Sequence, residues 1–365
     1  MTSLAERRGA APSPRALIIG TGLIGSSFGL ALRGAGWHVT GSDRDPAAAV
    51  AARELGAIDD IGDDPKAELA LIAVPAPQVD EVARQLLARQ PDADMVVTDV
   101  AGIKGSICAA IDDPRFIGGH PMAGSEQSGV TGARSDLFLG ASWVLTPGPA
   151  TPPELYGRLL GAVRAVGAQA VSLAPEDHDR LVALVSHLPH LVAASLMNEA
   201  SEASQSDASL LQLAAGGFRD MTRVAAGQPG IWPDVVVENR QAIIEGLDDL
   251  QQRLASLREA LLSSDRPSIR DMLTQASVAR RALPGQVVDP ATLAQVRVPV
   301  PDRAGVLAEI TAMASELSVS VVDVEIAHSV EGGRGVLIVV VDHDVAEHYA
   351  EVLRSRGFPC TVQEL

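Results

Sequence analysis

Three glycines near the start of the chain have the spacing of a phosphate-binding loop. Gly20, Gly22 and Gly25 lie in the run GTGLIG, between an apolar run typical of a strand and a stretch typical of a helix. In such a loop the first glycine permits a tight turn, the second lets the backbone approach a pyrophosphate, and the third allows close helix–strand packing. The amino end of the helix adds partial positive charge, so the pattern predicts a dinucleotide site.

An acidic residue at a suitable distance supports this interpretation. Asp43 ends the second predicted strand, eighteen residues after Gly25, where a carboxylate can accept hydrogen bonds from the adenosine ribose. It also repels a 2′-phosphate, which favours NAD over NADP, although Arg44 could turn toward such a phosphate instead. A glycine-rich turn without a ligand is the alternative. The predicted cofactor-binding residues are Gly20, Gly22, Leu23, Ile24, Gly25, Asp43 and Val74.

Other polar residues have side chains suited to acid–base or anion chemistry. His120 follows the apolar run 116–118, and imidazole titrates near neutrality, so it can accept a hydroxyl proton. Arg223 offers a planar guanidinium that matches a carboxylate. Taken alone, such a histidine is more often a structural loop residue, and such an arginine is more often a surface residue. His187 and His190 are three residues apart, but no third ligand has a companion spacing, and we predict no metal site.

The elements that would position these residues alternate in the first half of the chain. Helix-like stretches such as residues 78–89 separate apolar, strand-like runs. This alternation predicts an α/β domain with a parallel sheet, which binds ligands at the carboxyl ends of its strands. The predicted strands are residues 16–20, 38–43, 69–74, 95–100, 116–118, 142–146 and 168–172.

The rest of the chain divides into two parts. Residues 177 to about 283 have a helical pattern, and residues 240–262 carry an apolar stripe typical of a core or dimer helix. After a linker, the order strand, helix, strand, strand, helix, strand predicts a ferredoxin-like module. We therefore predict a Rossmann-type dinucleotide-binding domain (15–176), an all-helical substrate and dimerisation domain (177–285) and a C-terminal α+β domain (293–365), in a homodimer.

Composition narrows the class of protein. The 365 residues carry a net charge of −17, which excludes a broad basic face for nucleic acid. Cys108 and Cys360 are the two cysteines; they cannot form a disulfide framework, which suits a reducing cytoplasm. Three arginines before the uncharged run 16–32 imitate a signal peptide, but four glycines interrupt the run, and it is shorter than a ~20-residue membrane span. We predict a cytoplasmic protein without membrane association.

Four segments together resemble the prephenate/arogenate dehydrogenase family of tyrosine biosynthesis. They are residues 20–26 (GTGLIGS), 119–126 (GHPMAGSE), 186–190 (SHLPH) and 217–223 (GFRDMTR), with Asn239-Arg240 as a weaker match. The resemblance spans about residues 15–285. It implies a hydride transfer to NAD coupled to decarboxylation, in which the ring carbinol becomes ketone-like and loss of the ring carboxylate restores aromaticity.

The resemblance also assigns roles to residues. It implies that His120 is the general base for the substrate hydroxyl and that Arg223 binds a substrate carboxylate, with Asp220 orienting or pairing with it. His187 is expected to be more structural. The substrate contacts that the resemblance implies are Ser125, Glu126, His190, Asp220 and Trp232.

One position departs from the family pattern. Many relatives carry a serine after the strand that corresponds to residues 98–100, and that serine helps to bind the substrate hydroxyl beside the histidine. This chain has Gly102 there. The hydrogen bond is then missing, or water or Ser106 supplies it.

The C-terminal module begins with PDRAGVL (residues 301–307) and resembles an ACT domain, a small amino-acid-sensing module. Asp302 can cap the helix that follows, and Gly305 tolerates the close approach of a ligand. We therefore expect feedback inhibition by tyrosine bound near Asp302 and Gly305. A module that serves only dimerisation is the alternative.

The activity expected from the resemblance is oxidation of prephenate with NAD. Arogenate dehydrogenase is the nearest alternative, because its substrate differs only in an amino group in place of the side-chain keto group. A 2-hydroxy-acid dehydrogenase with an ACT tail would carry its glycine loop in mid-chain, whereas here the loop begins at Gly20. A non-catalytic amino-acid sensor that uses NAD structurally is an alternative from a different class.

Overall fold

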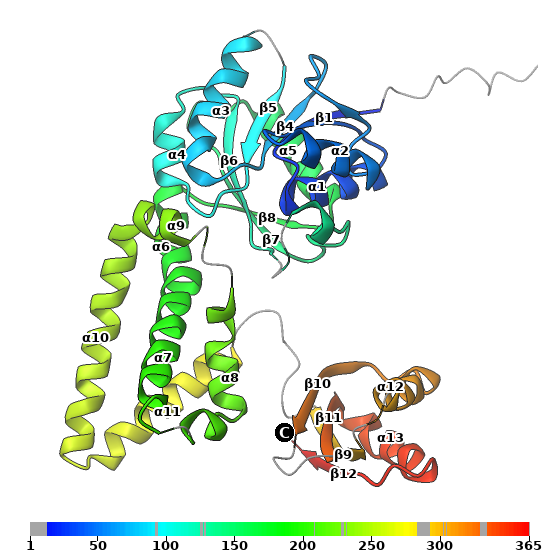
Figure 1. The fold of residues 1–365 in the computed structure, drawn as a ribbon, viewed down its shortest axis with the longest axis vertical. Helices are drawn as coiled ribbons and strands as arrows, with labels where there is room; N and C mark the ends of the chain where they lie inside the picture. Colours follow the sequence, from blue (N-terminus) through cyan, green and yellow to red (C-terminus); the bar gives the residue numbers. More distant parts are fainter. Residues whose placement is uncertain are drawn as a thin grey trace, which may run out of the picture. The chain divides into compact units, whose positions relative to one another are not determined.

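The computed structural model of the chain (Figure 1) describes residues 13–91, 94–124, 127, 129–207, 209–227, 230, 232–282, 293–301, 303, 305–328 and 334–364. It divides into two compact units, Met1–Arg253 and Leu254–Leu365. The first unit holds the glycine loop and the candidate catalytic residues, and the second holds the C-terminal sheet.

The first unit is built around an eight-stranded sheet in the order β3-β2-β1-β4-β5-β6-β7-β8. Neighbouring strands are parallel except for β6 and β7. Because β2 and β4 flank β1, the winding of the sheet reverses beside β1, the point where such folds bind ligands. The strands are β1 (Arg15–Ile19), β2 (His38–Ser42), β3 (Asp60–Ile61), β4 (Leu69–Ile72), β5 (Val96–Asp99), β6 (Phe116–Pro121), β7 (Ser142–Thr146) and β8 (Gln169–Ser172).

Helices cover both faces of this sheet because its strands are apolar on both sides. On β1, Ile18 belongs to the core shared with α1 (Leu23–Gly34) and α5 (Pro153–Ala165). Its neighbour Leu17 belongs to the core shared with α3 (Ala76–Arg89) and α4 (Gly105–Ala110). Successive strand side chains point to opposite faces, which is why these runs are almost entirely apolar. With α2 (Pro46–Glu54) after β2, the predicted α/β domain is confirmed.

Two features of this region differ from what the apolar runs of the sequence, taken one at a time, predict or resemble. The strand expected at residues 116–118 extends to Pro121, because its second half pairs with β7 in the antiparallel direction. His120 therefore lies within β6 and not after it. The run that imitates a signal peptide, residues 16–32, forms β1, the glycine loop and α1 at the centre of the sheet.

Beyond the sheet the chain is helical, as expected. α6 (Pro175–Val182), η2 (Ala183–His187) and α7 (Leu188–Ser204) form one helical segment, in which η2 is a π-helical turn. There the Leu188 N–H bonds to the Ala183 carbonyl, five residues back. The neighbouring Pro189 gives the physical reason. Proline lacks the N–H that would pair with the carbonyl four residues earlier, and its ring crowds that carbonyl, so the preceding turn widens.

This segment, Pro175–Ser204, is the one helix among the described residues that is long and apolar enough to cross a membrane. Its first half carries His178, Asp179 and His187, which bond to residues of β6, α4 and Asn239. We therefore assign the segment to the folded body of the first unit.

Several short helices and two long ones complete the helical part. They are η3 (Leu210–Leu213), α8 (Gly216–Thr222), η4 (Arg223–Ala226), α9 (Trp232–Glu238), α10 (Arg240–Leu262) and α11 (Arg266–Arg281). α10 has the bounds that its apolar spacing predicts, and the division between the two units falls within it.

The second unit contains the predicted ferredoxin-like module. Its elements follow the expected order: β9 (Leu293–Pro301), α12 (Val306–Glu316), β10 (Val321–His328), β11 (Arg334–Asp342), α13 (His343–Ser355) and β12 (Thr361–Glu364). The strands pair antiparallel in the order β10-β11-β9-β12. Ile310 of α12 and Tyr349 of α13 are fully buried in its core, and the Tyr349 hydroxyl donates to the Ile310 carbonyl at 2.9 Å.

Candidate active site

The glycine loop has the geometry that its residues require. Gly20 has a φ of +96°, and a Cβ there would collide with the Ala73 carbonyl and lie 3.2 Å from the Val74 side chain. A Cβ at Gly25 would collide with the Gly20 carbonyl, so this glycine lets α1 pack on the loop. A Cβ at Gly22 would meet no described atom within 4 Å. Gly22 is the N-cap residue of α1, and no side chain of its own caps the N–H groups there. The open space at the helix terminus fits a pyrophosphate.

Asp43 lies directly beside this loop. Its Oδ2 accepts hydrogen bonds from the backbone N–H (2.7 Å) and the hydroxyl (3.2 Å) of Thr21, and its Oδ1 accepts one from the Asp45 N–H (2.9 Å). These bonds hold the carboxylate beside the start of α1, whose first residues are Leu23 and Ile24. The predicted cofactor residues thus surround one loop, and their arrangement fits NAD. Arg44, the competing residue, is exposed.

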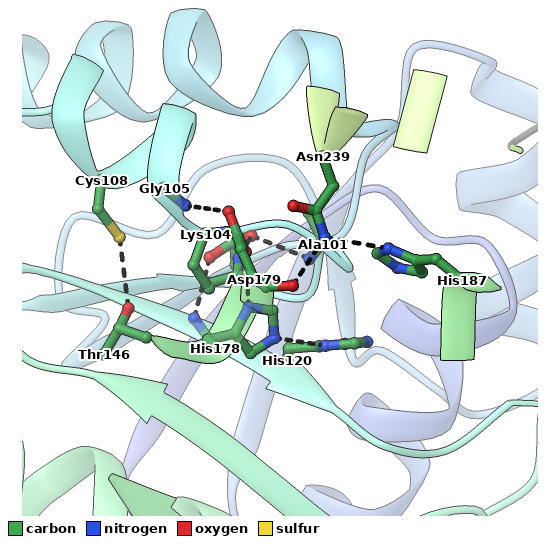
Figure 2. Close-up of polar contacts among 12 residues, drawn as sticks. Ala101, Lys104, Gly105, Cys108, His120, Thr146, His178, Asp179, His187 and Asn239 are labelled. Carbon is green, nitrogen blue, oxygen red and sulfur yellow. Dashed lines mark hydrogen bonds and ion pairs between the residues drawn. The ribbon is translucent and has the colours of Figure 1, made fainter. Parts of the chain in front are cut away.

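A partly buried chain of hydrogen bonds, centred on the buried His178, begins at His120 (Figure 2). His120 Nδ1 lies 2.9 Å from Nε2 of His178, and His178 Nδ1 lies 2.8 Å from Oδ1 of Asp179. The Asp179 carboxylate also accepts bonds from the backbone N–H groups of Lys104 (2.7 Å) and Gly105 (2.8 Å), where α4 begins. Three side chains therefore join β6, α6 and the amino end of α4.

A buried ion pair adjoins this chain. Asp99, the last residue of β5, and Lys104 are both fully buried and paired. Asp99 also accepts hydrogen bonds from the backbone N–H groups of Ala101 (2.9 Å) and Gly119 (3.0 Å). Buried charges need such additional bonds, because pairing alone does not offset their loss of hydration. The bond to Gly119 anchors the pair one residue before His120.

The electrostatics favour a neutral His120 and an ionised Asp179. Burial lowers the pKa of His120 well below its usual value near 6.5, and the positive charge of Lys104 lowers it further. His120 is therefore unprotonated at neutral pH and can accept a proton. Burial opposes ionisation of Asp179, but hydrogen bonds from His178 and from the N–H groups of Gly105 and Lys104 hold its pKa below the usual range.

Asn239 links this chain to a second histidine. Its Nδ2 donates to the Asp179 carbonyl oxygen (2.8 Å) and to Nδ1 of His187 (3.1 Å), as Figure 2 shows. Burial lowers the pKa of His187 to about 4, so its ring is neutral and its proton lies on Nε2. These contacts support the structural role expected for His187, which stays a prediction.

His190 and Trp232 extend the site. Their rings stack with centroids 3.6 Å apart at an interplanar angle of 10°, and Trp232 meets the His187 ring edge-on at 6.1 Å. Burial lowers the pKa of His190. The short helix η4 packs against α7, and a Cβ at Gly227 would lie 3.7 Å from the His190 ring. Arg223, the first residue of η4, therefore belongs to a segment that contacts the helix of His190.

The other predicted residues vary in how far the structure places them. Asp220 and Arg223 are exposed, at the end of α8 and the start of η4. Ser125, Glu126 and Asp302 lie outside the described residues. Gly305 has a φ of +89° and precedes α12 in the second unit. In the described part of the chain, no group of three or more His, Cys, Asp and Glu side chains is arranged to hold a metal ion.

Gly102 lies against His120, where the family pattern expects a serine. A Cβ at Gly102 would lie 3.7 Å from both Nε2 and Cε1 of His120. Ser106, the other candidate donor, lines a cavity of about 310 Å³ together with Asp80 and Glu238. His178 is the hydrogen-bond partner of His120 among the described contacts.

Four residues of this site were not among those predicted from the sequence. Asp99 and Lys104 carried a signal, because they are charges at the carboxyl end of an apolar strand and in the loop after it, where parallel sheets place their ligand sites. His178 and Asp179 carried none, since they open a helix in the manner of ordinary surface residues. Only the contact of His178 with His120, 58 residues earlier in the chain, reveals them.

The fold and this arrangement define a class of enzyme. Nicotinamide-dependent oxidoreductases typically combine a Rossmann sheet, a dinucleotide loop and an unprotonated histidine that can accept a proton. This chain has all three, with the histidine on a strand inside the sheet. Two family models specify the class further: the nucleotide-binding domain of prephenate dehydrogenase matches residues 28–172, and its dimerisation domain matches residues 174–275. The chain belongs to the prephenate dehydrogenase family, as its motifs predict.

Individual relatives agree with this assignment. The chain is 32% identical to the prephenate dehydrogenase of Bacillus subtilis over 348 residues, which cover 92% of this chain and 94% of that protein. It is 33% identical to the cyclohexadienyl dehydrogenase of Zymomonas mobilis, over 73% of this chain and 94% of that protein. The match to the Bacillus protein is long enough to include part of the C-terminal module.

Solved structures give the same family. The prephenate dehydrogenase of A. aeolicus, in complex with hydroxyphenyl propionate and NAD+, has a TM-score of 0.69 and 28% identity, over 74% of this chain and 99% of that chain. Synechocystis arogenate dehydrogenase has a TM-score of 0.63 and 31% identity, over 73% of this chain and 98% of that chain. The predicted fold class, family and NAD-dependent enzyme class are confirmed.

Proposed function

We propose that the protein is an NAD-dependent prephenate dehydrogenase, which converts prephenate to 4-hydroxyphenylpyruvate and CO2 in tyrosine biosynthesis. The observation that carries the proposal is the half-buried His120 of β6, which is bonded to His178 and whose lowered pKa leaves it able to take the hydroxyl proton of the substrate. The family models and the relative from Bacillus subtilis supply the reaction class.

The roles of the residues follow from the demands of this reaction. NAD, when bound at the glycine loop, supplies the hydride acceptor. His120 holds the ring hydroxyl and removes its proton, while Arg223, aligned by Asp220, binds a carboxylate of the substrate. The proposed substrate contacts are completed by Ser125, Glu126, His190 and Trp232.

Arogenate is the second candidate substrate. The resemblance to Synechocystis arogenate dehydrogenase, at 31% identity, is the observation that favours it. Prephenate and arogenate should therefore be offered in parallel, each with NAD and with NADP, while the absorbance of the reduced nicotinamide is followed. Turnover of prephenate with NAD supports the main proposal, and turnover of arogenate alone changes the substrate but keeps the mechanism. If neither compound reacts, the proposal fails.

Variants test the assigned roles in the same assay. We expect His120→Asn to lower kcat by about 10²- to 10⁴-fold, the usual contribution of a positioned general base. His348→Asn, at an exposed position of α13, is the matched control. We expect Arg223→Ala to raise KM for the substrate, with Arg219→Ala, on the neighbouring helix α8, as its control. An unchanged kcat in His120→Asn would contradict its role as the general base, whereas no formation of reduced nicotinamide by either protein would support a non-catalytic sensor.

We also propose that the C-terminal module senses tyrosine and that the enzyme is a cytoplasmic homodimer. The βαββαβ order of the second unit supports an ACT-like module, with Gly305 directly before α12. Asp302, the residue after Pro301 in the sequence, is its proposed partner in tyrosine binding. Calorimetry with tyrosine, using phenylalanine as the control ligand, tests the binding. If no heat of binding is observed and the kinetics are unchanged at saturating tyrosine, the sensing role is contradicted. The alternative, a module that serves only dimerisation, would then be favoured. Cell fractionation tests the location.

A further inference from the structure

The hydrogen-bond chain that ends at α4 determines where the ring protons lie. The two oxygens of Asp179 accept bonds from the backbone N–H groups of Lys104 and Gly105, so this ionised carboxylate can only accept from His178. His178 Nδ1, 2.8 Å from Oδ1, therefore donates. A neutral imidazole has one ring proton, so His178 Nε2 must accept. His120 Nδ1, 2.9 Å away, is then the donor.

We propose that His178, held by Asp179, is a positioning residue that fixes His120 in the Nδ1–H tautomer. Nε2 of His120 is then the unprotonated atom that receives the hydroxyl proton of the substrate. The identity of that hydroxyl rests on the proposed function, whereas the tautomer rests on the hydrogen bonds and on a single ring proton at His178.

The packing around the two rings supports this role. His178 is fully buried, both of its ring nitrogens are bonded, and it meets the His120 ring edge-on with centroids 5.1 Å apart. The opposite edge of His120 faces Gly102, where a Cβ would still be 3.7 Å from Nε2. The bonded nitrogen is thus covered by a side chain, while the free nitrogen faces a residue that has none.

The charges around His120 agree with a neutral ring. The groups that face it are Lys104, His178 and His187, and none of them carries a negative charge that would stabilise an imidazolium directly. The carboxylate of Asp179 contacts His178 and not His120, and that of Asp99 is paired with Lys104. A second proton on His120 is therefore disfavoured until the reaction delivers it.

The proton balance of the proposed reaction requires that the His120 ring be correctly oriented. It does not require that a proton be conducted away through His178 and Asp179. As hydride leaves the carbinol carbon for NAD, the hydroxyl proton passes to Nε2 and a ketone forms. The bond to the ring carboxylate then breaks, CO2 leaves, and its electron pair makes the ring a phenolate. The phenolate oxygen takes the proton back from Nε2. Because no net proton is released, His178 and Asp179 need only hold the ring in place.

Nitrogen-15 NMR of the full-length protein, labelled at histidine, measures the tautomer without any substrate. His120→Asn identifies the signals of His120 by their loss. At neutral pH we expect a protonated Nδ1 and an unprotonated Nε2 at His120. A protonated Nε2 would overturn the proposal whatever the activity of the protein, so this outcome is separate from a failure of the proposed function.

Kinetics then test the consequence. His178→Leu removes the acceptor and is expected to lower kcat by about 10²-fold with KM within about twofold, because only the orientation of the base changes. In His178→Gln, Oε1 can replace Nε2 as acceptor, and we expect it to recover at least tenfold of that loss; His348→Leu is the control. An unchanged kcat in His178→Leu contradicts the proposal, as does an unaltered His120 tautomer. If His178→Leu does not fold, the wild-type spectrum and His178→Gln decide.

Discussion

The histidines of the site show how identical side chains acquire different roles from their neighbours. His120 bonds through Nδ1 to another histidine, whereas His187 bonds through Nδ1 to an amide. His190 makes its main contact with its ring face, against Trp232. Burial keeps all of them neutral at pH 7 by lowering their pKa values, so hydrogen-bond direction, not charge, distinguishes them.

Gly102→Ser should strengthen substrate binding. The new Cβ has ordinary contact distances of 3.7 Å to the His120 ring, so the hydroxyl fits and can bond to Nε2 or to the substrate hydroxyl. One neutral hydrogen bond is worth about 0.5–1.5 kcal/mol, so we expect KM for the preferred substrate to fall by about two- to tenfold. Gly102→Ala adds the same Cβ without the hydroxyl. Equal KM values for the two variants would contradict this prediction.

Asp43→Asn should reduce the preference for NAD over NADP. The variant keeps an acceptor for Thr21 but loses the charge that binds the ribose hydroxyls and repels a 2′-phosphate. Hydrogen bonds to charged groups contribute about 1.5–3 kcal/mol, so we expect the ratio of kcat/KM values to fall by about 10- to 100-fold. Asp45→Asn is the control, because that carboxylate caps α2 through the Ala47 N–H. A similar change in both variants would argue against a role for Asp43 in selectivity.

At the scale of elements, periodicity and glycine spacing were sufficient to predict the sheet, α10 and the C-terminal module. These features depend on local pattern: strands alternate with helices, and α10 carries its stripe for 23 residues. Pairing across the sheet has no such local signal, so the extension of β6 against β7 was not predictable. For the same reason only part of the site could be predicted from the sequence. His178 is recognised as a site residue only through its contact with His120 on β6.

His187, the last residue of η2, bonds to Asn239 directly before α10, and the burial of its ring should make stability depend on pH. The folded pKa of His187, about 4, lies below its usual 6.5, so the unfolded chain binds more protons between these values. The free energy of unfolding should therefore fall as pH drops from 6.5 to 4, with His187 contributing on the order of 3 kcal/mol. His120 and His190 shift it in the same direction.

Denaturant unfolding across this pH range measures the effect. In His187→Asn, Oδ1 can replace Nδ1 as the acceptor from Asn239 and no longer titrates, so the fall in stability should become shallower. His343→Asn, at an exposed position of α13, is the matched control. The same pH dependence in wild type and His187→Asn would contradict the assignment.

At the scale of the whole molecule, the apolar stripe of α10 is only partly covered: Leu247, Leu250 and Leu257 are half-buried. Ile243, Leu254 and Leu261 lie on the same side of α10, and their exposed fractions rise from 3% to 55% and 60%. A stripe that is buried at one end and exposed at the other is typical of a helix that packs on its own domain and then on a second copy. The matched dimerisation domain includes this helix.

We therefore expect light scattering to give a mass of about 76 kDa, twice the chain mass of 37.9 kDa. Leu254→Glu combined with Leu261→Glu should shift the protein toward the monomer, because two buried charges would face the partner without compensation. Ser256→Glu, on the opposite side of α10, should leave the dimer intact. A wild-type mass of one chain would refute the homodimer.

The π-helical turn η2 sets the angle between two histidines of the site. His178 and His187 are nine residues apart, which is about two and a half turns of a regular α-helix and would aim them in opposite directions. A π turn holds about one residue more, so the second half of the helix lags by roughly a quarter turn. Both rings then reach the bonds around Asp179 and Asn239. Anyone who transplants this site to another scaffold must copy the residue count and Pro189 together with the histidines.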